Sequence, residues 1–419
     1  MKETEYRGRV PRLRFPDFRE TGEWATKSLK YVCELNPTSL GLPKEFVYID
    51  LESVEAGKLK VRKMIDRDNA PSRAQRLLEN RDVIFQVVRP YQRNNLHFIN
   101  NDNVHYVAST GYTQLRARES DSYLFQIIHT DDFVERVIAK CTGSNYPAIN
   151  SSDLAEISLA IPGLAEQQKI ADCLSSLDEL ITLEAQKLNA LKTHKKGLMQ
   201  QLFPAEGETV PRLRFPEFWG AGEWDKKQLE EFAVIVRGGS PRPIEAFLTI
   251  DTKGFNWLKI GDIDKESKFV TATQEKVIPA ALSKTRMVNP GDLILSNSMS
   301  FGRPYILKIE TCIHDGWIAI SEIHADIYRD YLYYLLMTSD SQEYFSNNAA
   351  GSGVQNLNAD IIKRLPIPYP GIKEQQKIAD CLSSLDELIT AQAKKIESLK
   401  THKTGLMQQL FPVLEETVA

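Results

Sequence analysis

Apolar side chains recur every three or four residues along two segments of the chain, residues 166–202 and 374–410. This alternation persists over about five heptads, which is typical of a coiled coil rather than of a short amphipathic helix. The positions that recur at this spacing form the expected interface between the helices, here called the seam. Two seam positions of each segment are polar: Glu184 and Lys195 in the first, and Gln392 and Lys403 in the second. The predicted helix-pair interface consists of Ile170, Leu174, Leu177, Ile181, Leu188, Leu191, Leu198, Leu202, Ile378, Leu382, Leu385, Ile389, Ile396, Leu399, Leu406 and Leu410.

The length of these segments predicts how they pack. A helix of roughly 37 residues is about 55 Å long, whereas a globular block of about 150 residues has a radius of gyration of only about 15 Å. Pro162-Gly163 precedes the first helix and Phe203-Pro204 follows it, as expected for helix boundaries. We expect the two helices to pair with each other, antiparallel about a pseudo-two-fold axis. The alternative is that each packs only on its own globular block.

The chain also repeats itself, which indicates a tandem duplication. The hexapeptide PRLRFP at 11–16 recurs at 211–216, and residues 166–182 recur unchanged at 374–390. Each copy is therefore a variable block followed by a nearly invariant helix. The C-terminal residues 415–418 resemble the residues that lead into the second PRLRFP, so the sequence has the form of a closed ring that has been cut once.

Short strand-like runs fill the variable blocks, at 46–49, 82–88, 293–295 and 317–320, and residues 330–339 have helical spacing. The predicted fold class is α+β, with two pseudo-repeated globular α/β heads of mostly β core separated by a long antiparallel two-helix coiled coil. The expected domains are residues 1–163 (first head), 164–204 (first helix), 205–371 (second head), 372–412 (second helix) and 413–419 (C-terminal tail).

Composition narrows the class of protein. The chain has 419 residues, 42% of them hydrophobic and 26% charged, so it contains enough apolar material for real cores. Its net charge of −4 argues against a wholly basic coat protein for nucleic acid. We see no apolar run of about 18 residues, and because the first residues lack an apolar segment we expect no secretory signal. Five scattered cysteines without a C-x-x-C motif fit a reduced cytosol, so we expect a cytoplasmic protein without membrane contact.

Charge is nevertheless concentrated locally. Residues 58–93 contain ten basic and four acidic side chains, and polar and aromatic residues follow. Arginine can bind phosphate or guanine, and Asn or Gln can pair with adenine. The alternative to DNA binding is, for this basic segment, a charged face exposed to solvent. For the corresponding polar segments of the second head, the alternative is ordinary turns. The candidate DNA-binding residues are Arg73, Arg76, Arg89, Tyr91, Gln92, Arg93, Thr110 and Tyr112 in the first head, and Arg242, Ser296, Asn297, Ser298 and Arg303 in the second.

Motifs for catalysis are missing from the sequence. It contains no G-x-x-x-x-G-K-[ST] phosphate loop and no H-E-x-x-H zinc motif. His194 and His402 are repeat mates without a second ligand nearby, so we predict no metal site. No nucleophile has a base at a usable spacing. We therefore expect heads that bind rather than catalyse.

Several motifs resemble one family. E-Q-Q-K-I-A occurs at 166–171 and 374–379, each helix ends in G-L-M-Q-Q-L-F-P, and the second head contains R-G-G-S-P-R-P at 237–243. Together with two variable blocks alternating with two near-identical helices, these motifs resemble the specificity (S) subunit of a Type I restriction-modification system. The resemblance covers essentially the whole chain.

The resemblance implies a division of labour. Each head would be a target recognition domain that reads one half of a split sequence in double-stranded DNA, and the helices would set the gap. Methyltransferase (M) subunits, two per S subunit, would bind S-adenosylmethionine, and restriction (R) subunits joined through M would use ATP and Mg²⁺. This chain would bind no cofactor and would not be an enzyme. The alternatives are a coiled-coil scaffold that does not bind DNA, and the recognition subunit of a fused Type II-like complex.

Overall fold

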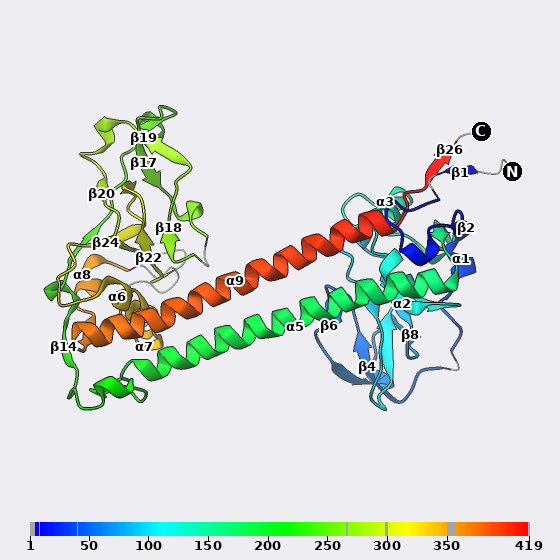
Figure 1. Ribbon diagram of the computed structural model, residues 1–419, viewed down its shortest axis with the longest axis horizontal. Coiled ribbons are helices and arrows are strands. Elements are labelled where there is room, and N and C mark those ends of the chain that lie inside the picture. Colours follow the sequence, from blue (N-terminus) through cyan, green and yellow to red (C-terminus); the bar gives the residue numbers. More distant parts are fainter. Residues whose placement is uncertain are drawn as a thin grey trace. The chain divides into compact units, whose positions relative to one another are not determined.

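The computed structural model describes residues 5–7, 9–39, 41–264, 267–297, 301–349 and 357–417. The chain forms two compact units, residues 1–185 with 394–419 and residues 186–393 (Figure 1). Each unit therefore contains one head, part of the first long helix and part of the second. The domain boundaries expected from the sequence remain a prediction.

Two four-stranded sheets build the first head. Strands β4 and β11 are parallel, and the other neighbours in both sheets are antiparallel. One sheet has the order β10 (Leu96–His97), β9 (Val83–Gln86), β12 (Tyr112–Ala117) and β3 (Cys33–Leu35), and the other has the order β7 (Lys63–Asp66), β4 (Glu45–Ile49), β11 (Tyr106–Ser109) and β8 (Ala74–Leu77).

Capping side chains start three of the four short helices described in the first head. Ser120, Thr130 and Asn150 each accept a backbone N–H three residues further along the chain. The helices are α1 (Leu29–Val32), α2 (Asp121–Ile127), α3 (Asp131–Ala139) and α4 (Ser151–Ala155). Two-stranded pairs complete the unit: β2 (Ala25–Ser28) with β13 (Ser158–Ile161), β5 (Val54–Glu55) with β6 (Lys58–Leu59), and β1 (Glu5–Arg7) with β26 (Glu415–Thr417).

The second head repeats this plan with two five-stranded sheets. One has the order β15 (Val234–Arg237), β24 (Trp317–Ser321), β21 (Leu293–Ser296), β22 (Pro304–Leu307) and β18 (Phe269–Val270). The other has the order β16 (Leu248–Thr249), β19 (Glu275–Val277), β17 (Phe255–Leu258), β23 (Thr311–Ile313) and β20 (Arg286–Val288), and β14 (Asp225–Gln228) pairs with β25 (Pro366–Tyr369).

Two of the three short helices described in the second head start at repeat mates of the first head's caps. Thr338 and Asn358 cap α7 and α8 as Thr130 and Asn150 cap α3 and α4. The helices are α6 (Arg329–Leu336), α7 (Ser339–Asn348) and α8 (Ala359–Lys363). Short 3-10 helices occur in both heads at Pro16–Phe18, Arg67–Asn69, Pro90–Gln92, Pro216–Phe218, Leu229–Glu231, Ile244–Ala246, Ile260–Asp262 and Pro279–Ala281.

The predicted elements of the heads are confirmed. The expected strands correspond to β4, β9, β21 and β24, and the expected helix corresponds to α6. The fold class, two mixed heads of mostly β core together with two long helices, is also confirmed.

The long helices α5 (Leu164–Leu202) and α9 (Ile372–Leu410) have 39 residues each. In the first unit, both carboxylate oxygens of Asp178 accept from Lys403 Nζ at 2.7 Å, and Glu184 pairs with Lys395. Because residue numbers rise along α5 as they fall along α9, the helices run antiparallel in this unit, as predicted.

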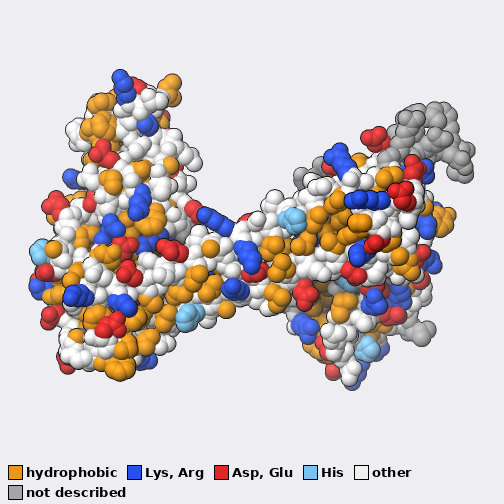
Figure 2. Space-filling view, viewed as in Figure 1, with side chains coloured by type: hydrophobic (Ala, Val, Ile, Leu, Met, Phe, Trp, Pro, Cys, Tyr) orange, Lys and Arg blue, Asp and Glu red, His pale blue; other side chains and the backbone are white. Residues whose placement is uncertain are grey.

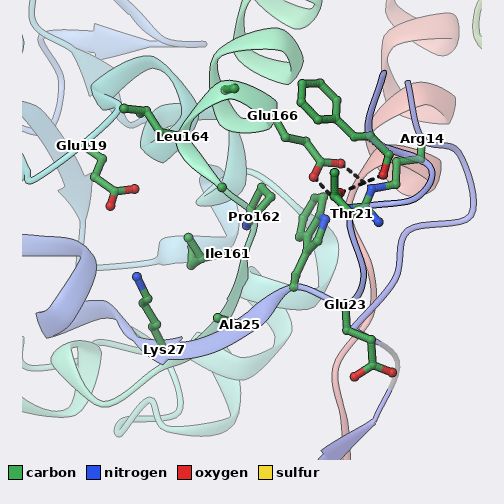
Figure 3. Close-up of a pocket in the computed structure, with 14 residues that line it drawn as sticks. Arg14, Thr21, Glu23, Ala25, Lys27, Glu119, Ile161, Pro162, Leu164 and Glu166 are labelled. Atoms are coloured by element: carbon green, nitrogen blue, oxygen red, sulfur yellow. Dashed lines mark hydrogen bonds and ion pairs between the residues drawn. The ribbon is translucent and has the colours of Figure 1, made fainter. Parts of the chain in front are cut away.

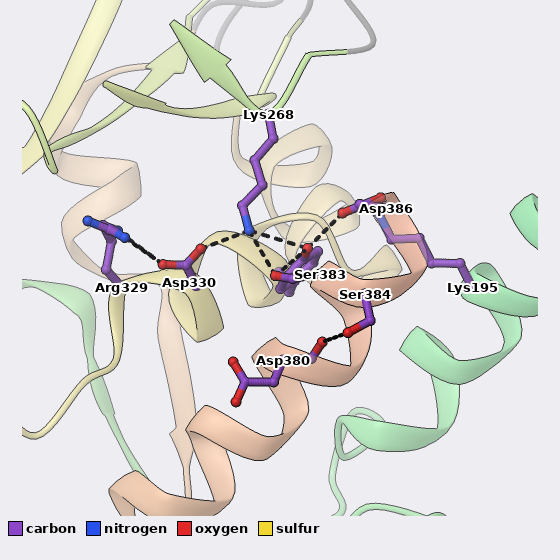
Figure 4. A network of polar contacts seen from close by, with 9 residues as sticks. Lys195, Lys268, Arg329, Asp330, Asp380, Ser383, Ser384 and Asp386 are labelled. Atoms are coloured by element: carbon purple, nitrogen blue, oxygen red, sulfur yellow. Dashed lines mark hydrogen bonds and ion pairs between the residues drawn. The ribbon is translucent and has the colours of Figure 1, made fainter. Parts of the chain in front are cut away.

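In the second unit, Lys195 Nζ lies 2.6 Å from Asp386 Oδ1. The other oxygen of Asp386 accepts from the hydroxyl of Tyr334 at 2.6 Å, and Lys268 reaches both Tyr334 and Asp330 (Figure 4). The network links α9, α5, α6 and the residue that precedes β18. The end of α5 and the beginning of α9 also share one apolar core, so the antiparallel pairing holds in this unit too.

All sixteen predicted seam residues are buried or half-buried. The outermost ones lie in the cores of the heads: Ile170 and Leu174 pack in the first together with Leu410. Both seam lysines pair with aspartates of the other helix. Each long helix therefore packs on a head at both of its ends as well as on its partner.

An arginine anchors the start of each long helix to its head. Arg14 donates from Nε and one terminal nitrogen to the two oxygens of Glu166, both at 2.7 Å, beside a pocket of about 530 Å³ (Figure 3). Its third nitrogen donates to the carbonyl of Gly22 at 2.6 Å. Arg214 and Glu374 repeat the arrangement at 2.8 Å in the second unit.

In each unit, the PRLRFP segment that contains this arginine also contacts the end of a long helix. Leu213 N–H donates to the carbonyl of Gln201 at 2.9 Å within a continuous stretch of chain, and Leu13 N–H donates to Gln409 at the same distance. In the first unit the segment and the helix come from opposite ends of the sequence, where β1 and β26 pair antiparallel. The repeat therefore has the same junction in both units.

We expect Glu166→Gln to lower the free energy of unfolding of the first unit by about 3 kcal/mol, because it leaves a buried guanidinium without its counter-charge. Glu374→Gln should do the same in the second unit. Calorimetric unfolding of the full chain measures both effects.

The matched control is Glu23→Gln, since Glu23 pairs with Arg9 where both side chains are exposed. That change should alter stability by less than about 1 kcal/mol. Equal effects of Glu166→Gln and Glu23→Gln would contradict the anchoring role.

Candidate nucleic-acid interface

The turn between β11 and β12 brings together three segments of the first head. Thr110 N–H donates to the carbonyl of Arg73 at 2.8 Å, and Val87 N–H donates to the carbonyl of Gly111 at 3.0 Å. Arg89 follows Val87 by two residues. Three of the candidate DNA-binding residues, Arg73, Arg89 and Thr110, therefore surround one turn.

The second head builds the same turn between β23 and β24. Asn297 N–H donates to the carbonyl of Gly316 at 3.0 Å, and its Nδ2 donates to the carbonyl of Asp315 at 2.8 Å. Gly316 thus corresponds to Gly111, and Asp315 occupies the place of Thr110. One head presents a hydroxyl where the other presents a carboxylate.

The carboxylate of Asp315 is the centre of a polar cluster. It accepts from the Ser240 hydroxyl at 2.6 Å and from Arg242 at 3.3 Å, while Arg237 Nε donates to its backbone carbonyl at 2.8 Å. The hydrogen bond from Ser240 is the main cause that lowers the pKa of Asp315. The group is therefore an ionised acceptor, which is the chemistry that suits the amino group of cytosine.

Two glycines let the loop after β15 pack closely against the backbone of neighbouring segments. A Cβ on Gly238 would lie 2.1 Å from the carbonyl oxygen of His314, and one on Gly239 would lie 2.7 Å from that of Lys284. Burial lowers the pKa of His314, whose Nδ1 accepts from Gly316 N–H at 2.8 Å. The R-G-G-S-P-R-P segment is thus a closely packed loop that presents Ser240 and Arg242 beside the turn.

Unpaired cations lie near the turn of the first head. The side chains of Arg73, which is exposed, and Arg76, which is half-buried, form no ion pair within the described residues. Arg89 stacks over the ring of Tyr146 at 4.3 Å. Tyr91 is half exposed, and Gln92 accepts from Gln86 at 2.9 Å.

Four other cations of the basic segment are neutralised by carboxylates of the same head. Basic and acidic side chains are interspersed on the face of the molecule that Figure 2 shows. The local excess of positive charge is consequently smaller than the sequence suggested. The pairs are Lys60 with Glu55, Arg62 with Asp102, Arg67 with Asp68, and Arg81 with Asp121.

Arg93, a candidate for the DNA face, is paired within the first head, and its place on that face stays a prediction. Its guanidinium donates to the carbonyl of His129 at 3.0 Å and to Asp131 at 2.6 Å, and this pairing lowers the pKa of Asp131. Arg93 therefore fastens its segment to the start of α3. Its repeat mate Arg303 is half-buried and lies 5.7 Å from the ring of Tyr305, with no described partner for Nε.

Three further candidates are buried, which corrects the expectation that they line a DNA face. Tyr112 and Ser296 are fully buried, and Asn297 is 2% exposed. The hydroxyl of Tyr112 donates to the carbonyl of Asp50, because the second sheet covers the strand at this point. Asn297 shapes the turn from inside. Ser298 lies outside the described residues.

Asp315 was missed by the sequence reasoning, although the sequence contains a signal. Thr110-Gly111-Tyr112 and Asp315-Gly316-Trp317 each combine a polar residue, a glycine and an aromatic residue after a strand. Aligning the two heads on this tripeptide would have identified the position.

Within the described residues, no group of three His, Cys, Asp or Glu side chains is arranged to bind a metal ion. Among the described helices, none combines the length and apolar character that crossing a bilayer requires.

Comparison with known proteins gives one consistent family. A model described as a Type I restriction modification DNA specificity domain matches residues 22–193 and 221–401. The putative type I restriction enzyme MjaX specificity subunit of Methanocaldococcus jannaschii is 26% identical over 64% of this chain, which spans 61% of that relative. The MjaVIII specificity subunit of the same organism is 25% identical over 70% of this chain and 69% of the relative.

Solved structures share the fold. The S subunit of a Type-I restriction-modification system from M. genitalium has a TM-score of 0.57 at 17% identity, covering 96% of this chain and 99% of that one. A structure from work on complex assembly of the type I R-M system has a TM-score of 0.61 at 22% identity, covering 93% and 97%.

We expect Gly238→Ala to destabilise the second head by about 1–3 kcal/mol, because the new methyl group would overlap the carbonyl of His314. Gly261→Ala is the matched control, since a Cβ there meets nothing within 4 Å. Thermal unfolding of both variants checks the expectation, and equal melting temperatures would contradict the close packing of the loop.

Proposed function

Because this chain belongs to the Type I restriction modification DNA specificity family, we propose that it selects the DNA sequence on which a restriction-modification complex acts. Each head contacts one half of a two-part target in double-stranded DNA. The observation that carries this proposal is the pair of equivalent turns, which present unlike side chains on one shared frame.

The two turns support different half-sites. Thr110 offers a hydroxyl that can donate or accept, whereas Asp315 offers only acceptor oxygens. Around them lie Arg73 and Arg89 in one head, and Arg242 in the other, as candidate contacts to phosphate or guanine. Two heads with the same backbone and different polar groups can read different bases.

The long helices support a fixed gap between the half-sites. A helix of 39 residues is about 58 Å long. This length suits two heads that engage major grooves one to two helical turns apart, at about 34 Å per turn.

The partners follow from the same proposal. The chain binds two methyltransferase subunits, and restriction subunits join through them. S-adenosylmethionine, ATP and Mg²⁺ belong to those partners, and this chain contributes recognition without catalysis. Partner subunits also share the phosphate contacts, which reconciles DNA binding with a net charge of −4.

A direct test uses the full chain assembled with its methyltransferase subunits. Methylation mapping of the host genome identifies the split motif, and gel shifts compare the intact duplex with duplexes in which one half-site is scrambled. We expect each scrambled duplex to bind at least 10-fold more weakly. A protein-binding scaffold would bind all three duplexes alike or not at all.

A second test lengthens the helices. Inserting seven residues after Ala185 and seven after Ala393 keeps the seam in phase at positions that are repeat mates. The helices grow by about 10.5 Å, so we expect the preferred gap to grow by about 3 base pairs. A gap that stays unchanged in binding selections would contradict the spacer role. Insertion into one helix alone disrupts the pairing and should abolish binding.

A further inference from the structure

Arg76 lies on an edge strand of the first head. Strand β8 ends the order β7-β4-β11-β8, so no described strand pairs with its outer side. Arg76 is opposite Ala108 of β11, which is itself beside Ile49 of β4. Thr110 follows Ala108 by two residues, so Arg76 borders the turn that presents Thr110.

Arg286 has the equivalent place in the second head, although sequence reasoning did not identify it. Strand β20 is also an edge strand, and Arg286 is opposite Ile313 of β23, which is beside Leu258 of β17. Asp315 follows Ile313 by two residues. Arg286 therefore has the same position relative to Asp315 as Arg76 has relative to Thr110.

The two arginines also share a face of their sheets. Side chains of directly opposite residues point to the same side. Ala108 and Ile49 pack in the core between the two sheets of the first head, and Ile313 and Leu258 do so in the second. Arg76 and Arg286 therefore each lie at the rim of the inter-sheet core of their own head, at equivalent positions.

Neither guanidinium is neutralised by a residue that the structure describes. Within the described residues, the side chains of Arg76 and Arg286 form no hydrogen bond or ion pair. Burial lowers the pKa of Arg76, and its Nε is buried without a partner among the described residues. A partly buried cation without a counter-charge is costly, and an external anion would remove that cost.

Nearby lysines of the second head are already engaged. Lys284 lies 4.7 Å over the ring of Phe247, and Lys259 pairs with Glu275 at 2.7 Å. Arg286, in contrast, is exposed and free within the described chain.

We infer that Arg76 and Arg286 are matching contacts to DNA phosphates, one in each head. The inference rests on the proposed function. A phosphate is favoured over a base because the same side chain recurs at the same place in two heads whose turns otherwise differ. Only the backbone is common to two different half-sites.

The test measures DNA binding by the full chain assembled with methyltransferase subunits, at several salt concentrations. Arg76→Ala and Arg286→Ala should each weaken binding about 10-fold for target and scrambled duplexes alike. Each should also reduce the slope of log affinity against log salt by about one. Lys226→Ala, an exposed cation on β14, is the matched control and should change neither value.

The outcomes separate the inference from the proposed function. Failure of the wild-type complex to distinguish target from scrambled duplexes would overturn the proposed function. Normal discrimination with an unchanged salt slope for Arg286→Ala would overturn the inference alone, as would a changed base preference at one half-site. Arg286→Lys retains the charge and should keep the salt slope, which makes the test independent of whether the alanine variant folds.

Discussion

The alignment of α5 against α9 depends on one aspartate–lysine pair in each unit. Asp178 meets Lys403 in the first, and Asp386 meets Lys195 in the second. A lysine in an apolar seam needs a carboxylate, and such a polar seam residue fixes register at some expense of stability. In a parallel pairing, repeat mates would face each other, so lysine would meet lysine and aspartate would meet aspartate. Only the antiparallel arrangement satisfies all four charges.

The heads depend on this helix pair because each is built onto helix ends. The bidentate pairs of Arg14 with Glu166 and of Arg214 with Glu374 join the start of each long helix to a head. Leu410 packs in the core of the first head and Leu202 in that of the second, so the end of the other helix is also embedded. The residues that the two repeats share thus hold each head to the ends of the long helices.

The two repeats keep the same backbone arrangement but have different polar side chains at equivalent positions. Asp178 accepts from Gln126 of α2, whereas the equivalent Asp386 accepts from Tyr334 of α6. Arg93 pairs with Asp131, whereas its mate Arg303 lies over Tyr305. The turn contains Thr110 in one head and Asp315 in the other. One backbone therefore tolerates different polar groups at the same points, which suits a family of specificity domains.

The sequence by itself determined the long helices, their antiparallel pairing, the duplication and the main strands, because periodicity and repeats are local or are visible by direct alignment. Tertiary structure alone decided which polar residues are exposed. Tyr112 and Asn297 follow strand and turn patterns typical of a surface, but a second sheet or a folded-back loop covers them. Arg93 finds its carboxylate 38 positions away. Burial and charge pairing depend on neighbours distant in the chain, which no local pattern reveals.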